Sequence, residues 1–177
     1  IKTVLVGTGQ TGLMQGAKYG IAMDAVPPQF CCGELEGAIV AASEVEQPDV
    51  ILIEGQGALS HPAFCTSAFI LRGSQPDAVI LQYAPKRAHR CDFPNMPMPS
   101  LASEIALIES FADTKVICVT LNHEGMSEAE ITDTIAAQSQ QLGVPVTDVL
   151  ARPAAHLLAM MVAEYPSLTQ VPSMAAT

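Results

Sequence analysis

The sequence predicts an α/β fold of three layers, with helices on both faces of a mostly parallel sheet. Of its 177 residues, 49% are hydrophobic and only 15% are charged, a composition typical of a chain with a large core. Short apolar runs alternate with segments of helical periodicity, as in βα units of a doubly wound sheet. The length favours one domain, residues 1–177.

The expected strands are short runs rich in β-branched residues. One of them, Val50–Ile53, has no polar alternation, which is typical of a strand buried on both faces of a parallel sheet. In chain order the expected strands are Lys2–Gly7, Val50–Ile53, Asp77–Tyr83, Lys115–Leu121 and Pro145–Val149.

Capping residues mark two of the expected helices. Ser100 begins one of them, and Ser127 with Glu130 forms a capping box that begins another, which Gly143 ends. The expected helices are Gln29–Ser43, Pro62–Leu71, Ser100–Phe111, Ser127–Leu142 and Ala154–Glu164. A glycine-rich loop, Thr8–Gly20, and an extended proline-rich loop, Pro85–Pro99, are expected between elements, and the tail after Pro166 is expected to fray.

Charge and cysteine usage exclude several classes of function. A formal net charge of −10 argues against a nucleic-acid partner. No apolar run reaches the ~18 residues that cross a bilayer, so no membrane partner is expected. The five cysteines show no CxxC spacing, so we expect neither a zinc site nor a disulfide framework, and a cytoplasmic location. The chain opens on a strand without Met, from which we expect a missing amino-terminal portion.

Glu54 is the first candidate site residue. It follows the strand Val50–Ile53 directly, and Gly55-Gln56-Gly57 and then Ser60-His61-Pro62 come after it. Ligands of open α/β sheets bind outside the carboxyl ends of the strands, so an acid flanked by glycines there indicates a metal or substrate site. The alternative is a solvated acid before a tight turn.

A second glycine motif, Gly7–Gly12, matches G-x-G-x-x-G after a strand. A dinucleotide fingerprint needs a helix to begin at its third glycine, and the glycines and prolines that follow do not favour one. A complete phosphate loop is also lacking, because Leu13 and Met14 stand where Lys and Ser or Thr would be.

Several motifs, taken together and in order, resemble the carboxy-terminal P-loop domain of the DgcN-type D-glutamate N-acetyltransferase family, long catalogued as a domain of unknown function. The resemblance covers about Lys2 to Leu158. One turn departs from it, since Lys18-Tyr19 replaces the acid of a Gly-Asp-Gly-like turn. The motifs are Thr8–Met14, Ala22–Val26, Ile53–Gly57, Ser60–Pro62, Gly73–Ala78 and Pro145–Asp148.

The resemblance implies a P-loop-NTPase-like fold whose Walker A segment precedes Lys2. The chain is then a fragment that lacks this segment and the family's amino-terminal Rossmann-like domain. The implied activity moves an acetyl group from acetyl-CoA to the amino group of D-glutamate or a related acidic D-amino acid. Glu54 takes the place of the Walker-B-like acid.

We infer site roles from these positions. Glu54 or His61 is the catalytic base, and backbone N–H groups near the glycines stabilise the oxyanion. Arg87 and Arg90, which form a basic group with Lys86, bind substrate carboxylates or CoA phosphates. His89 and His123 follow strands and are weaker candidates, and His156 lies in an apolar helix. The expected substrate- or cofactor-binding residues are Thr8, Gln10, Thr11, Gly12, Asp24, Gly55, Gln56, Gly57, Ser60, Arg87 and Arg90.

Two alternatives stay open. In one, the protein is an ATP- and magnesium-dependent P-loop enzyme, an NTPase or a ligase-like enzyme, in which Glu54 is a metal ligand. In the other, a bound nucleotide only regulates a partner. We expect a small-molecule substrate and a homo-oligomer.

Overall fold

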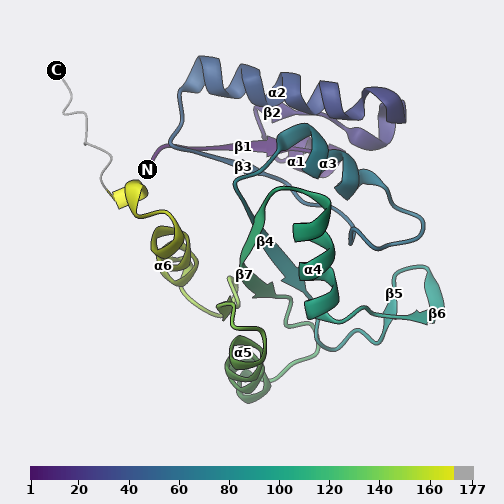
Figure 1. The fold of residues 1–177 in the computed structure, drawn as a ribbon, viewed down its shortest axis with the longest axis vertical. Helices are drawn as coiled ribbons and strands as arrows, with labels where there is room; N and C mark the ends of the chain where they lie inside the picture. The colour runs from purple at the N-terminus through teal and green to yellow at the C-terminus, as the bar shows by residue number, and fades with distance from the viewer. Residues whose placement is uncertain (170–177) are drawn as a thin grey trace. The chain divides into compact units, whose positions relative to one another are not determined.

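The computed structural model describes residues 1–169. The chain forms two compact units, one from residues 1–76 together with 166–169, the other from residues 77–165. Each unit contains a three-stranded sheet whose strands are all parallel, and strands alternate with helices along the chain (Figure 1). The predicted α/β fold class is confirmed.

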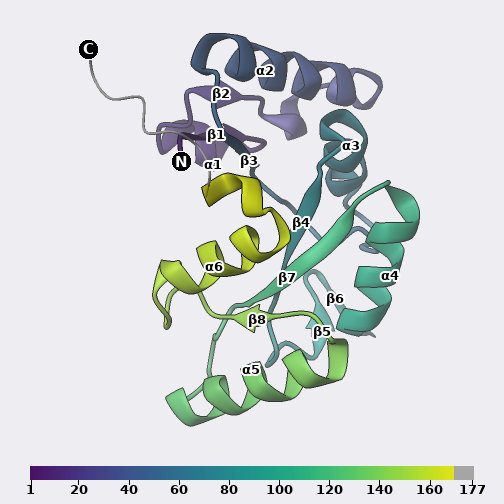
Figure 2. The same ribbon diagram turned by 60° about the vertical axis from the view of Figure 1, so that its left-hand side comes forward.

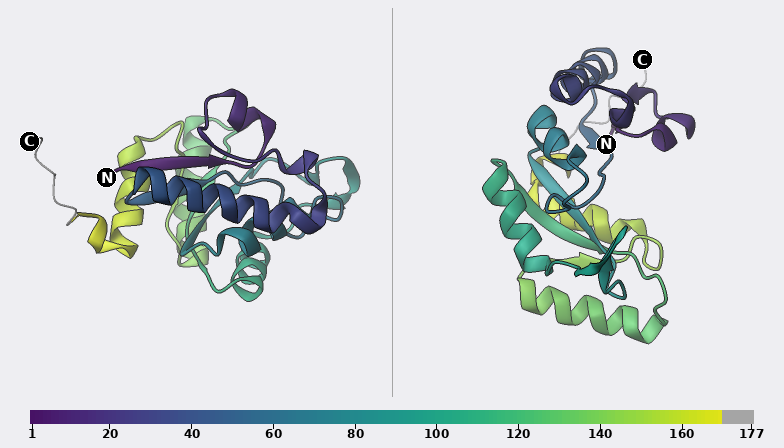
Figure 3. Two further views of the ribbon diagram at one scale, coloured as in Figure 1. Left: turned by 90° about the horizontal axis from the view of Figure 1, so that it is seen from above. Right: turned by 90° about the vertical axis from the view of Figure 1, so that its right-hand side faces the viewer.

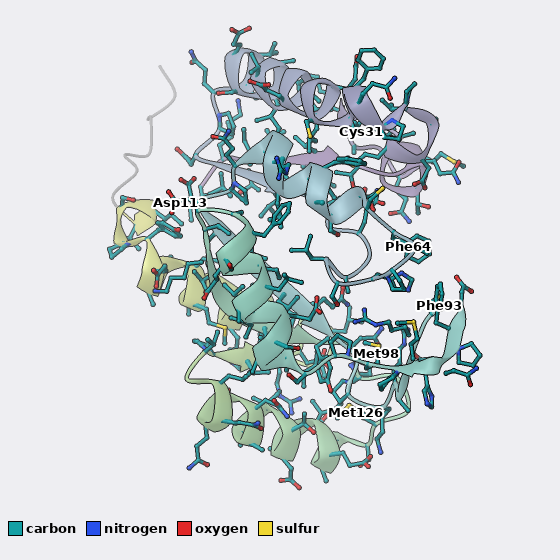
Figure 4. All side chains as sticks on the ribbon, turned by 45° about the vertical axis from the view of Figure 1, so that its right-hand side comes forward. Cys31, Phe64, Phe93, Met98, Asp113 and Met126 are labelled. Carbon is teal, nitrogen blue, oxygen red and sulfur yellow. The ribbon has the colours of Figure 1, made fainter. Side chains whose placement is uncertain are left out.

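The first unit is built on β1 (Thr3–Gly7), which lies between β2 (Tyr19–Gly20) and β3 (Val50–Ile53). Helix α2 (Cys31–Glu46) covers this sheet and packs against α3 (Thr66–Ser74), as Figure 1 shows. The core between sheet and helices contains Val6, Met23, Cys31, Leu35, Ala42 and Ile70, and Figure 4 labels Cys31 at the start of α2.

Only one face of β1 and β3 is well covered within the structure. Ile51 and Ile53 pack on the core below α2. Leu52 is 40% exposed and its partner on β1, Leu5, is 46% exposed. The bounds predicted for β3 are confirmed, but its predicted burial on both faces is wrong, because the Leu5 and Leu52 side chains are exposed.

The glycine-rich segment contains a helix that we did not predict. Helix α1 (Gln10–Met14) starts after Gly9, whose extended backbone serves as the N-cap. Two glycines with positive φ, Gly16 and Gly20, follow it. At Gly20 a Cβ atom would lie 2.1 Å from the carbonyl oxygen of Gly7, so only glycine fits there.

The helices of this unit begin at other residues than the sequence predicted. Short 3-10 helices span Met23–Ala25 and Pro28–Phe30, so α2 begins at Cys31 instead of Gln29. Helix α3 begins at Thr66 instead of Pro62, because the preceding residues form turns, in one of which His61 Nδ1 accepts the N–H of Ala63.

The second unit is built on β7 (Lys115–Leu121), which lies between β4 (Ala78–Tyr83) and β8 (Val146–Thr147). Helices α4 (Leu101–Phe111) and α6 (Ala154–Glu164) contact β7 and lie on opposite faces of this sheet (Figures 2 and 3). Its core includes Leu101, Val119, Leu121 and Val146, with Ile105 and Ile135 packed against them.

Helix caps in this unit follow the prediction. Ser100 accepts a hydrogen bond from the Ser103 N–H at 3.1 Å, and Ser127 and Glu130 form the capping box of α5 (Glu128–Leu142). Gly143 ends α5 with a φ of 67°.

The proline-rich segment is a hairpin, so the predicted extended loop is wrong. Strands β5 (His89–Arg90) and β6 (Phe93–Pro97) pair antiparallel around Asp92, whose φ is 62°. Prolines fit because an edge strand needs N–H donors on one side only. The strand predicted at Pro145–Val149 is shorter in the structure, where β8 spans Val146–Thr147.

Residues 166–169 form a 3-10 helix, and the rest of the predicted frayed tail lies outside the described residues. Across residues 1–169, no helix combines the length and the apolar character that a membrane span requires.

Candidate functional site

Thr8 and Glu54 meet at the carboxyl edge of the first sheet, where β1 and β3 end side by side. The backbone N–H groups of Thr8 and Gly9 donate to Glu54 Oε2 at 2.8 and 3.1 Å. In return, Thr8 Oγ1 donates to the backbone carbonyl oxygen of Glu54 at 3.0 Å. One carboxylate oxygen therefore holds the start of the glycine-rich segment in place.

Gln56 completes this connection. Its Nε2 donates to the Thr8 carbonyl oxygen at 2.7 Å and to Thr8 Oγ1 at 3.1 Å. The same carbonyl oxygen accepts the N–H of Met23 at 3.1 Å, and Thr8 is fully buried. The two predicted glycine segments are thus joined through Thr8, and buried polar groups joined in this way fix a loop tightly.

Gly12 allows α1 to approach the carboxylate. A Cβ atom at this position would lie 2.7 Å from Glu54 Oε2, closer than carbon and oxygen pack. Glu54 and Gly12 also line a pocket of about 560 Å³, together with Gln15, Lys18, Tyr19 and Glu46.

Lys18 and Tyr19 both contact Glu46 at the rim of this pocket. The Lys18 ammonium, followed by the hydrogen bonds from Tyr19 and Lys2, lowers the pKa of Glu46 to about 2. The pocket is therefore lined by Glu46, which pairs with Lys18 and Lys2, and by the Glu54 carboxylate.

Glu54 offers one oxygen to a ligand. Across the described residues, Oε1 makes no hydrogen bond, whereas Oε2 accepts two. In the same part of the chain, no group of three or more His, Cys, Asp or Glu side chains is arranged to hold a metal ion. The geometry suits a proton acceptor or a hydrogen-bond acceptor for a cationic substrate group.

His61 orders the loop that follows β3. Its ring stacks on Phe64, labelled in Figure 4, with centroids 4.4 Å apart, and its Nδ1 accepts the N–H of Ala63 at 3.2 Å. Phe64 also packs on Gly57, where a Cβ atom would lie 3.3 Å from the phenyl ring. Because Nδ1 is an acceptor, the neutral ring carries its proton on Nε2, which makes that atom a donor.

The remaining predicted residues lie at several places. Gln10 and Thr11 belong to α1, and Asp24 lies in the 3-10 helix that follows β2. Gly55 continues directly from Glu54 and has open space at its Cβ position. Ser60 belongs to the His61 loop.

The two predicted arginines belong to the second unit. Arg87 makes an exposed pair with Glu124, through Nε at 3.1 Å and a terminal nitrogen at 2.8 Å. Arg90 ends β5. The first unit thus brings together Thr8, Gly9, Gly12, Glu54 and Gln56.

A histidine–aspartate pair lies at the carboxyl edge of the second sheet. His123 Nδ1 is 2.6 Å from Asp148 Oδ2, and Asp148 Oδ1 accepts the N–H groups of Leu150 and Ala151 at 2.9 Å each. Asp148 is fully buried. Burial raises the pKa of Asp148, but the hydrogen bonds from Ala151, His123 and Leu150 together outweigh burial and lower it.

The sequence pointed to His123 only as a histidine after a strand, and it did not pair the ring with Asp148. The pairing depends on the strands before the two residues being neighbours in the sheet, where the carboxyl ends of parallel strands meet.

Comparison with known proteins identifies the family. Residues 1–158 match the family model described as "Domain of unknown function (DUF1611_C) P-loop domain". A D-glutamate N-acetyltransferase of Pseudoalteromonas sp is 34% identical over 149 residues, which cover 81% of this chain and 44% of that protein. A D-glutamate N-acetyltransferase of Tritonibacter scottomollicae is 30% identical over 154 residues, which cover 84% of this chain and 45% of that protein.

A solved structure supports the same family assignment. The crystal structure of a DUF1611 family protein from Anabaena variabilis ATCC 29413 superposes with a TM-score of 0.85 at 31% identity, over 92% of this chain and 48% of that one. The chain thus spans less than half the length of these relatives. The resemblance predicted from the ordered motifs is confirmed, and the chain belongs to the DUF1611 family, whose P-loop domain it contains.

Proposed function

We propose that this protein transfers an acetyl group from acetyl-CoA to the amino group of D-glutamate or a related acidic D-amino acid. The observation that carries the proposal is the match, over more than four-fifths of the chain, to two relatives that are named D-glutamate N-acetyltransferase. The family model spans both carboxyl edges described above, including Glu54, His123 and Asp148.

The reaction sets clear chemical requirements. The substrate ammonium must lose a proton before its nitrogen can attack the thioester carbonyl, so a base is needed. The negative oxygen that develops needs hydrogen-bond donors, and the carboxylates of the amino acid need cationic partners.

Glu54 offers a fixed acceptor that can hold a substrate ammonium at the pocket of the first unit. Its Oε1 is the oxygen available at the pocket wall, and the two N–H donors on Oε2 fix the carboxylate in one orientation. A fixed carboxylate positions an ammonium group at little entropic cost. His61, the other base inferred from the sequence, suits donation better, since Nδ1 already accepts the Ala63 N–H.

Within the second unit, Arg87 offers a cation for a substrate carboxylate. Its guanidinium forms a forked pair with Glu124 on the surface, with both side chains more than half exposed. Exposed pairs of this kind are weak, so a substrate carboxylate can replace Glu124 on the same two nitrogens.

Assaying the full-length protein for release of the CoA thiol tests the proposal. With acetyl-CoA and D-glutamate and without ATP, we expect thiol release and an N-acetylated product, with a lower rate on L-glutamate. No release with any acidic D-amino acid would refute it.

The P-loop family match favours one second candidate, an ATP- and magnesium-dependent enzyme. That candidate predicts phosphate release that requires magnesium and does not depend on acetyl-CoA. Binding of ATP with neither phosphate release nor acetyl transfer would instead indicate a nucleotide-regulated protein.

A further inference from the structure

We propose that His123 and Asp148 form a second functional site, a proton-accepting dyad in which His123 Nε2 takes the proton of the substrate ammonium. The inference rests on the proposed function, which it deepens by assigning the base to the second unit. Asp148 is the positioning residue, since it acts through the imidazole.

The hydrogen bonds fix the tautomer of the imidazole. Both oxygens of Asp148 are in use, Oδ1 by the N–H groups of Leu150 and Ala151 and Oδ2 by His123. A carboxylate can only accept, so His123 Nδ1 donates to it, and the neutral ring then has its lone pair on Nε2. This is the reverse of His61, whose Nδ1 is an acceptor.

The dyad lies where a ligand of an α/β sheet is expected. His123 follows β7 and Asp148 follows β8, two parallel strands that pair through Thr120 and Thr147 next to the dyad. The carboxylate is fully buried, whereas the His123 side chain is 35% exposed. Among the described residues, Nε2 makes no hydrogen bond, so the basic nitrogen remains available at the surface.

A purely structural reading explains only half of this arrangement. Oδ1 alone caps the turn from Asp148 to Ala151, and an asparagine would serve equally well there. The second oxygen is 2.6 Å from Nδ1 of a partly exposed imidazole, a contact that the turn itself does not need. A buried carboxylate that orients an accessible histidine is the arrangement of a general base in acyl-transfer enzymes.

The charged groups around the dyad suit an acidic amino acid. Glu124, next to His123, binds Arg87 on the facing segment after β4. The N–H of Arg152 donates to the Asp148 carbonyl oxygen at 2.8 Å, and its guanidinium pairs with Glu128. A substrate whose carboxylate replaces Glu124 on Arg87 brings its ammonium toward the strand end that carries His123.

Proton transfer to His123 precedes the transfer of the acetyl group. Nε2 takes one proton from the ammonium, and the freed nitrogen pair forms a C–N bond to the thioester carbonyl carbon. The C–S bond breaks, and its electron pair leaves on sulfur. The sulfur takes the proton from the imidazolium, whose charge Asp148 stabilises in the meantime, and the second amine proton passes to water.

The test compares full-length wild type with His123→Gln and Asp148→Asn. We expect His123→Gln to lower kcat by about 100-fold or more, the contribution typical of a general base, while KM for acetyl-CoA stays near wild type and urea unfolding shows a folded protein. His156→Gln is the matched control, since His156 lies on α6 at the opposite end of β7 and should keep wild-type kcat. A wild-type kcat in His123→Gln overturns the proposal.

A second readout does not depend on activity. Long-range proton–nitrogen NMR of wild type above pH 8 should show His123 with its proton on Nδ1, and Asp148→Ala should shift the ring toward the Nε2–H form that free histidine prefers. An Nε2–H ring in wild type overturns the dyad. A wild-type protein without acetyl transfer instead refutes the proposed function, and the NMR measurement still decides the dyad.

Discussion

Thr8 and Glu54 hold each other through two hydrogen bonds of opposite direction. The Thr8 N–H donates to the Glu54 carboxylate at 2.8 Å, and the Thr8 hydroxyl donates to the Glu54 carbonyl oxygen at 3.0 Å. The ends of β1 and β3 are therefore joined at their carboxyl edge.

Glu54→Ala should destabilise the protein by about 3 kcal/mol, because it leaves the N–H groups of buried Thr8 and half-buried Gly9 without an acceptor. Glu54→Gln keeps an acceptor oxygen and should cost only about 1–2 kcal/mol, the difference between charged and neutral bonds. Both variants should lose acetyl transfer if Glu54 acts as proposed. Urea unfolding measures the stability, with Glu44→Ala, on an exposed turn of α2, as the control. If Glu54→Ala, Glu54→Gln and Glu44→Ala are equally stable, the hydrogen bonds from Thr8 and Gly9 to Glu54 do not stabilise the protein.

Gly12→Ala should destabilise the protein by about 1–3 kcal/mol, as overpacking does. The new methyl group would meet Glu54 Oε2 at 2.7 Å and push the carboxylate away from the loop. Gly37→Ala is the matched control, since Gly37 lies in α2 with open space at its Cβ position. That change should leave the protein equally or more stable, because alanine favours helices. If thermal unfolding shows the two variants alike, the close approach is absent.

Asp148 should contribute an acid-sensitive part of the stability. Its folded-state pKa lies below the ordinary value of 3.8, so the unfolded chain takes up the proton first as pH falls. The stabilisation is complete well above pH 3.8 and is lost as pH falls through the folded-state pKa.

Unfolding free energies measured from pH 7 down to pH 2 should therefore show wild type and Asp148→Asn converging below pH 4. Glu46 and Glu130, whose pKa values Lys18 and Lys86 respectively lower to about 2, change both proteins alike. A gap that stays constant over this range would contradict the assignment.

Arg87→Ala should raise KM for D-glutamate about tenfold or more, the loss expected for one charged hydrogen-bonded pair, with a smaller change in kcat. Lys115→Ala is the control, because Lys115 also forms an exposed pair, with Glu164, but at the amino end of β7. Steady-state kinetics of both variants measure KM and kcat for D-glutamate. An unchanged KM in Arg87→Ala removes Arg87 from substrate binding.

Much of the fold is predictable because local signals and burial agree. The run Val50–Ile53, the capping box at Ser127 and the helix Ala154–Glu164 all occur where the sequence places them. Each combines a hydrophobic pattern with a clear start or stop residue, and such agreement across levels is what specifies an element.

The elements that the sequence missed depend on tertiary contacts. Helix α1 contains Gly12, a poor helix former, and its N-cap makes no side-chain hydrogen bond; the adjoining Thr8 and Gly9 are held by Glu54, a residue 45 positions or more away. The β5–β6 hairpin carries Pro94 and Pro97, which on sequence grounds argue against strands. A contact with a distant residue decided the first case, and the local turn at Asp92, with a φ of 62°, accompanies the second.

In the candidate site, too, one part was predictable from the sequence and another was not. The acid at position 54 and its contact with the glycine-rich segment follow from strand order, because neighbouring parallel strands end at one edge. The pairing of His123 with Asp148 spans 25 residues and depends on β7 and β8 being neighbours, which no local pattern states.

The most direct test of acetyl transfer uses acetyl-CoA labelled with carbon-13 in the acetyl group, the full-length protein and D-glutamate, without ATP, and follows the product by mass spectrometry. We predict labelled N-acetyl-D-glutamate in an amount equal to the CoA released. Unlabelled D-glutamate recovered intact, together with phosphate released from added magnesium and ATP, would contradict the account.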